Sequence, residues 1–166
     1  LLYFEKIPKM YQNLKKIQKI FYKCYFDENE TQKIFEGLMQ NKNYNFSRYN
    51  FFLANYLVHQ NKINDAKKII QTARKEYNSN LLLKQEEIFL NEKDEKVKNF
   101  FSCKNPKDVL AEFFYVLANL YSTEKDYQMS NFYLKISLFL NNKFLTNKTL
   151  LAENYFYQKK HQLSKD

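Results

Sequence analysis

The near absence of glycine and proline limits this sequence more than any other feature. Its 166 residues contain one glycine and two prolines. β-Sandwiches, barrels and Rossmann folds need many tight turns, and turns with a positive φ favour glycine. A chain this poor in both residues is suited to long helices joined by short polar turns. The sequence therefore predicts an all-α fold.

Apolar residues recur at steps of three and four along most of the chain, which is the spacing of one helix face. The pattern predicts helices at about 10–24, 34–39, 47–60, 63–77, 81–90, 97–103, 106–121, 127–140 and 146–158, then the start of a tenth, and no strand. Pro106 and Asp108 suit a helix start, because proline fits the first turn and a carboxylate favours its positive end. Gly37 lies inside the second helix, where glycine costs about 1 kcal/mol relative to alanine. A close helix–helix contact and random drift would each explain it.

The formal net charge is +9, and lysine supplies nearly all of it, since Arg48 and Arg74 are the only arginines. Arginine makes most bidentate contacts to bases and phosphates. Lys, Asn, Ile, Phe and Tyr are abundant together, as an AT-rich genome would encode, so we attribute the charge mainly to coding bias. Lysines and tyrosines on the first helix keep nucleic-acid binding open as an alternative; they are Tyr11, Lys15, Lys16, Lys19, Tyr22 and Lys23.

Few residues suggest chemistry. The two histidines, His59 and His161, have no partner at metal-ligand spacing, and one glycine cannot build a phosphate loop. The acid pairs Glu86-Glu87 and Asp94-Glu95 are expected on the solvated surface. The sequence therefore predicts no enzyme, no metal and no cofactor.

The two cysteines, Cys24 and Cys103, lie far apart among apolar neighbours. We expect both to be free and buried as small hydrophobes, with no disulfide framework. No apolar run approaches the roughly 18 residues that span a membrane. We expect the native termini to lie beyond Leu1 and Asp166, which leaves the cellular location open.

The sequence matches itself at two shifts, which we call the short and the long shift. The short shift places Leu117-Ala118 on Leu151-Ala152 and Tyr121 on Tyr155. The long shift places Leu53-Ala54-Asn55 on Leu117-Ala118-Asn119. The short shift also pairs Ser130 with Ser164, and the long shift also pairs Leu57 with Tyr121, Ile63 with Tyr127, Ala66 with Ser130, Ile70 with Leu134 and Ala73 with Ser137. The matches need no gaps, so the chain is predicted to repeat.

This pattern of large aromatic, leucine, small residue and tyrosine, then small residues one helix later, resembles the tetratricopeptide repeat. Segment 111–144 carries it as Phe114, Leu117, Ala118, Tyr121, Ser130, Leu134, Ser137 and Asn142, and segment 47–80 as Asn50, Leu53, Ala54, Leu57, Ala66, Ile70, Ala73 and Asn78. The resemblance implies an α-solenoid, a right-handed superhelix of antiparallel helix hairpins. The alternative is an irregular helical bundle with accidental self-similarity.

The resemblance divides one continuous solenoid into five segments. They are a degenerate hairpin at 1–46, a repeat at 47–80, a short degenerate pair at 81–110, a repeat at 111–144, and a truncated repeat at 145–166.

The resemblance also implies a function, a scaffold that binds a protein or peptide in the concave groove lined by the first helix of each repeat. The groove positions of the first repeat are Arg48, Phe51, Asn55, Val58 and His59; those of the next are Glu112, Tyr115, Asn119, Ser122 and Thr123; those of the last are Thr146, Thr149, Glu153, Phe156 and Tyr157. Aromatic rings and amides there suit an extended or helical segment. Alternatively, neighbouring subunits or further repeats cover these positions. Self-association through exposed repeat ends also stays open.

Overall fold

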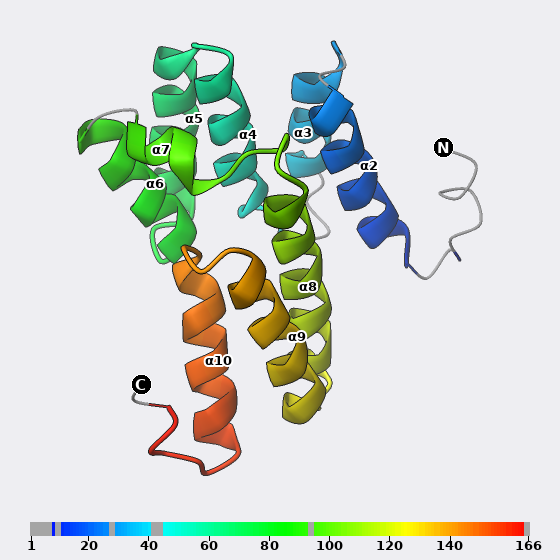
Figure 1. Cartoon of the computed structure of the whole chain (residues 1–166). Coiled ribbons are helices and arrows are strands. Elements are labelled where there is room, and N and C mark those ends of the chain that lie inside the picture. The colour runs from blue at the N-terminus through cyan, green and yellow to red at the C-terminus, as the bar shows by residue number, and fades with distance from the viewer. Residues whose placement is uncertain (1–7, 9–10, 27–28, 41–44, 93–94, 165–166) are drawn as a thin grey trace. The chain divides into compact units, whose positions relative to one another are not determined.

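All regular secondary structure in the computed structural model is helical (Figure 1). The structure describes residue 8 and residues 11–26, 29–40, 45–92 and 95–164, and over these it forms nine helices and no strand. The chain packs as two compact units, residues 1–105 (unit 1) and residues 106–166 (unit 2). Each unit is described by itself.

Unit 1 contains α2 (Gln12–Phe26), α3 (Thr31–Met39), α4 (Tyr49–His59), α5 (Ile63–Glu76), α6 (Leu81–Glu92) and α7 (Glu95–Phe100). Unit 2 contains α8 (Pro106–Thr123), α9 (Tyr127–Leu140) and α10 (Leu145–Tyr157). The all-helical prediction is confirmed, and α8 begins at Pro106 as expected. The predicted start of a tenth helix is wrong over residues 158–164, which form turns. Met10, the loop at 41–44 and the side chains of the Asp94-Glu95 pair lie outside the described residues.

Helix α4 is the centre of unit 1, where it contacts α3, α5, α6 and α7. Aromatic rings fill the space around it. Phe52 lies edge-on to Phe21 of α2, with ring centroids 5.1 Å apart, and to Phe101, at 4.7 Å. All three rings are fully buried. Burying each large aromatic side chain contributes roughly 2–3 kcal/mol, so this cluster is the main apolar core of unit 1.

A disulfide joins Cys24 of α2 to Cys103, which follows α7, with the Cα atoms 5.6 Å apart. The expectation of two free cysteines and no disulfide is therefore wrong. The residues are 79 positions apart in sequence, but the fold brings α2 beside the segment after α7. Sequence separation alone does not determine spatial separation, which is why spacing gave the wrong expectation. The bond closes a loop that includes α3 to α7.

Helices α8, α9 and α10 of unit 2 pack against one another. Small residues lie where the predicted hairpins cross. Ala118 and Ser130 are fully buried between α8 and α9, as Ala54 and Ala66 are between α4 and α5. Small side chains allow two helix backbones to approach closely. Both helix pairs therefore bury small residues that the long shift aligns.

Three helix ends repeat the spacing found in the sequence. Asn61, Lys125 and Lys159 follow α4, α8 and α10 with φ of 60°, 63° and 58°. The long shift places Asn61 on Lys125, and the short shift places Lys125 on Lys159. In each case the next residue donates its backbone N–H to a carbonyl five residues back, at 2.8–2.9 Å, which is the Schellman pattern of helix termination. The three helices thus end in the same way at equivalent positions.

Gly37 lies on an exposed side of α3. A Cβ atom built there would meet nothing within 4 Å. The close helix–helix contact that would explain this glycine is therefore absent among the described residues.

Candidate functional site

The predicted groove positions of the first repeat lie on α4 or, for Arg48, directly before it, and most are covered. Phe51, Asn55 and Val58 are fully buried. The Phe51 ring packs edge-on against Phe100, with centroids 5.2 Å apart, and Asn55 Nδ2 donates to Glu86 Oε1 at 2.9 Å. Helix α6 and the segment 100–101 therefore cover this face of α4.

The remaining two groove positions, His59 and Arg48, also contact other residues of unit 1. His59 is exposed, but its Nε2 lies 3.0 Å from the carbonyl oxygen of Phe101. The Arg48 guanidinium lies 5.6 Å from the centroid of the Phe52 ring, a cation–π distance. The groove positions of the first repeat are thus occupied largely by the chain itself.

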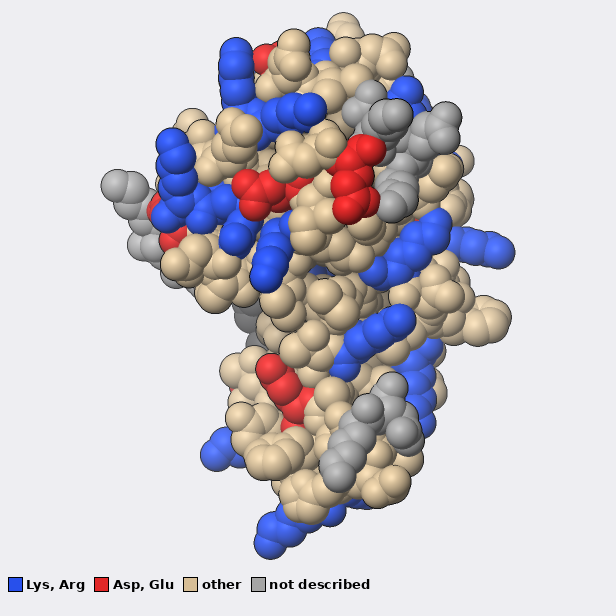
Figure 2. Space-filling view, turned by 90° about the vertical axis from the view of Figure 1, so that its left-hand side faces the viewer, with Lys and Arg blue, Asp and Glu red and all other residues tan. Residues whose placement is uncertain are grey.

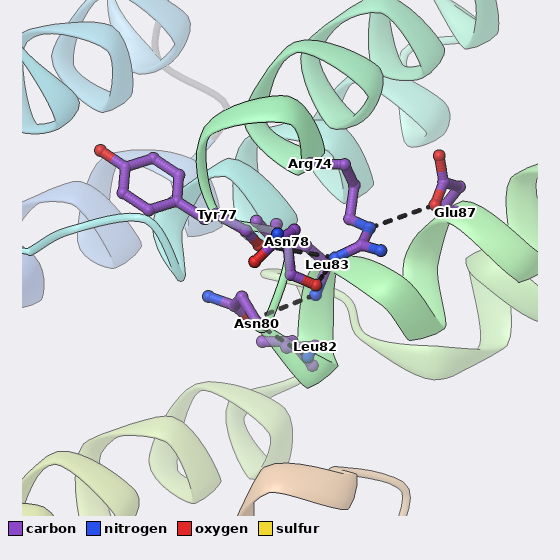
Figure 3. Close-up of polar contacts among 7 residues, drawn as sticks. All are labelled: Arg74, Tyr77, Asn78, Asn80, Leu82, Leu83 and Glu87. Carbon is purple, nitrogen blue, oxygen red and sulfur yellow. Dashed lines mark hydrogen bonds and ion pairs between the residues drawn. The ribbon is translucent and has the colours of Figure 1, made fainter.

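Side-chain hydrogen bonds and an ion pair hold the turn between α5 and α6 (Figure 3). Asn80 Oδ1 accepts from the backbone N–H of Leu82 at 3.1 Å and of Leu83 at 3.3 Å, so it caps the first turn of α6. Arg74 donates to the carbonyl oxygen of Asn78 and pairs with Glu87 at 3.2 Å. These contacts tie the end of α5 to the start of α6.

The expectation that Glu86 lies on the solvated surface is wrong, because its side chain is fully buried against α4. Burial raises the pKa of the Glu86 carboxyl to about 8, although the hydrogen bond from Asn55 acts in the opposite direction. Glu86 Oε2 and Asn55 Oδ1 have no hydrogen-bond partner among the described residues. The site therefore favours a neutral carboxylic acid at pH 7.

The sequence carries a signal for this burial. Glu86 lies four residues after Leu82 and four before Leu90, both of which are buried on α6. That spacing places the carboxyl on the apolar face of the helix. An assignment by charge alone overlooks this position.

The equivalent positions on α8 are more open. Glu112 is fully buried, but Tyr115 and Ser122 are half-buried and Asn119 and Thr123 are exposed. The backbone carbonyl of Asn119 accepts from Thr123 Oγ1 at 2.9 Å. Helix α8 therefore presents an amide with a half-buried aromatic residue one turn before it.

The positions on α10 expose large aromatic side chains. Phe156 is 58% and Tyr157 is 63% exposed. Tyr157 stacks on Tyr127, with centroids 5.6 Å apart, and Phe156 lies edge-on to His161 at 5.3 Å. Glu153 is exposed, whereas Thr146 and Thr149 are half-buried. The end of α10 is thus an exposed aromatic surface with an acid one turn earlier.

A buried network of amides and hydroxyls holds α10 against α8 and α9. Asn154 Nδ2 donates to Ser130 Oγ at 2.7 Å and to Asn131 Oδ1 at 2.9 Å, and its Oδ1 accepts from Ser122 at 2.7 Å. Asn147 donates to Ser137 at 2.6 Å, nearer the start of α10. Because these bonds satisfy the buried amides, they fix the orientation of the faces that carry the candidate residues.

Charge and ligand chemistry add little to the site. In Figure 2 basic side chains are spread over the face shown, with acidic ones among them. Within the described ranges, no three His, Cys, Asp or Glu side chains gather as a metal site would require. None of the helices in those ranges is both long and apolar enough to span a bilayer.

No family model, curated protein or solved structure matches this chain.

Proposed function

We propose that this protein is an interaction scaffold built from tetratricopeptide-like repeats, an α-solenoid that binds a segment of another protein. The observation that carries the proposal is the recurrence of one helix ending after α4, α8 and α10, at positions related by the long and the short shift. A shared ending supports a common role as the first helix of a repeat. Buried small residues at equivalent crossings support the same register.

The binding face that we propose lies on unit 2. Its residues are Tyr115, Asn119 and Ser122 of α8 and Thr149, Glu153, Phe156 and Tyr157 of α10. Asn119 can bond a peptide backbone, and exposed aromatic rings supply apolar contact area. The α4 face is closed by Glu86, Phe100 and Phe101, so we propose no partner there.

The test starts with capture of partners from cells of the source organism, followed by titration with purified components. The variant Tyr115→Ala with Asn119→Ala should weaken binding by about 2–4 kcal/mol, because it removes an aromatic anchor and an amide. Glu124→Ala, exposed directly after α8, is the matched control and should bind like wild type. Circular dichroism should show that both variants keep their helix content.

Equal binding by wild type and the double variant would rule out this face. Capture of RNA or DNA alone, released by moderate salt, would favour the nucleic-acid alternative. That alternative rests on α2, where Lys16 and Lys19 are exposed, although Lys23 pairs with Glu30 at 3.5 Å.

A further inference from the structure

Helix α9 has an unusual distribution of side chains for a helix packed against two others. Its buried residues are Ser130, Asn131, Leu134 and Ser137, three of which are polar. Its exposed residues include Phe132, 54% exposed, and Phe139, 89% exposed. Scattered exposed apolar residues are normal on protein surfaces. Two exposed phenylalanines on one face of a helix whose fully buried residues are mostly polar call for a physical explanation.

The exposed phenylalanines belong to a regular seam. We define the outer seam of α9 as Met129, Phe132, Ile136 and Phe139, which follow one another at steps of three, four and three. Met129 and Ile136 are half-buried. Alternating steps of three and four form the stripe by which one helix pairs with another. The outer seam therefore has the spacing that a second helix needs.

The charges beside the two exposed phenylalanines are basic, whereas Asp126 caps the start of α9, where its side chain accepts from the backbone N–H of Met129 at 3.1 Å. Lys135 is exposed between Phe132 and Phe139, and Lys143 is exposed just beyond the end of α9. From Tyr127 to Lys143 the sequence contains no Asp or Glu. A helix with acidic residues flanking its apolar stripe would complement these lysines.

A second copy of this chain fits the seam less well. Antiparallel pairing that sets Phe132 against Phe139 brings the two Lys135 side chains together near the two-fold axis. Like charges so close oppose this antiparallel pairing, so charge favours a different, acidic partner over it.

We propose that the outer seam of α9 docks an acidic amphipathic helix of another protein. Apolar side chains of that helix pack around Phe132 and Phe139, and its acidic side chains pair with Lys135 and Lys143. The surface lies on α9, whereas the face proposed above lies on α8 and α10, so either proposal can fail without the other.

The probe is a fluorescent synthetic helix of about three heptads, with leucine at the a and d positions and glutamate at e and g. A matched peptide carries lysine in place of every glutamate. Anisotropy titrations of the full chain should show binding of the glutamate peptide only. Phe132→Ser with Phe139→Ser should weaken that binding by at least about tenfold. Both side chains are exposed, so circular dichroism should show an unchanged fold.

Two further variants sharpen the result. Lys135→Glu should reverse the preference toward the lysine peptide, at least in part. Tyr115→Ala with Asn119→Ala should leave peptide binding unchanged, which separates this surface from the α8 and α10 face. Equal binding of the two peptides, or no loss in the double Phe variant, would overturn the proposal. A concentration-dependent dimer that Phe139→Ser abolishes would also overturn it, because the occupant would then be a second copy.

Discussion

Residues that the long shift pairs have opposite environments in the two units. In unit 1, Asn55 is fully buried and donates to Glu86, and Phe51 packs on Phe100. In unit 2, the equivalent Asn119 is exposed and Tyr115 is half-buried. Self-similarity in the sequence pairs residues of like type. It does not predict whether the rest of the chain covers them.

The cores of the units differ as well. Unit 1 is built on buried phenylalanines and is cross-linked by the Cys24–Cys103 disulfide. Unit 2 has few fully buried large side chains, and amide and hydroxyl hydrogen bonds centred on Asn154 hold its helices together. The stability of unit 1 should therefore depend on its disulfide and its apolar core, and the stability of unit 2 on the hydrogen bonds of its polar network.

Reducing the disulfide should produce the largest difference in stability between the two units. A cross-link between residues 79 positions apart stabilises by about 4 kcal/mol through the unfolded chain. Hydrogen exchange with and without reductant should show faster exchange in α4 after reduction, while α8 and α9 keep their protection. Equal loss of protection from hydrogen exchange in both units would contradict the separation of the two cores.

Overpacking a helix crossing is the next largest test. Ala118 is fully buried where α8 meets α9, so Ala118→Leu should destabilise unit 2 by about 1–3 kcal/mol. Lys135→Ala, at an exposed position of α9, should change stability by less than about 0.5 kcal/mol. Urea unfolding of the two variants measures the difference. Equal midpoints would show that the register of the hairpin is wrong.

The buried acid makes unit 1 sensitive to pH. The folded pKa of Glu86 is raised from 4.5 to about 8, so between these values the folded state holds a proton that the unfolded state has lost. The contribution of this group to the free energy of unfolding is therefore fully present below pH 4.5. It falls as the pH rises and levels off above pH 8.

Glu86→Gln keeps the shape of the side chain but cannot ionise. Between pH 6 and 8 the free energy of unfolding of wild type should fall by up to about 2 kcal/mol relative to this variant. At pH 4.5 the difference should be small, which serves as the internal control. Denaturant curves across this range measure it. Parallel pH profiles would mean that the carboxyl is not held neutral.

The smallest expected effect concerns Gly37. A Cβ there meets nothing within 4 Å, so Gly37→Ala should stabilise α3 by about 1 kcal/mol through helix propensity alone. A rise in the thermal midpoint of unit 1 would bear this out. A fall would reveal a close contact at this position.

The parts of the fold that depend on local pattern could be predicted from the sequence. The spacing of apolar residues predicted the helices, and the matched small residues predicted buried positions such as Ala54 and Ala118. The left-handed residues that end α4, α8 and α10 are spaced along the chain by the long and the short shift. Helix periodicity and termination are local properties, so they are visible in the sequence.

The parts that depend on distant contacts could not be predicted. The bond between Cys24 and Cys103 needs α2 beside the segment after α7, which spacing in sequence cannot reveal. The long shift pairs Asn55 with Asn119, and α6 makes the difference between them by placing Glu86 against Asn55. Such contacts are set by tertiary packing.

Asn55 is buried in unit 1, whereas Asn119, which the long shift pairs with it, is exposed in unit 2, and two single substitutions test this difference. Asn55→Ala removes the hydrogen-bond partner of buried Glu86 and should cost about 1–3 kcal/mol. Asn119→Ala alters an exposed side chain and should change stability by less than about 0.5 kcal/mol. The measurement is the free energy of unfolding of both variants against wild type in one buffer. A large loss for Asn55→Ala alone is the predicted result, and equal losses, or a larger loss for Asn119→Ala, would contradict the account.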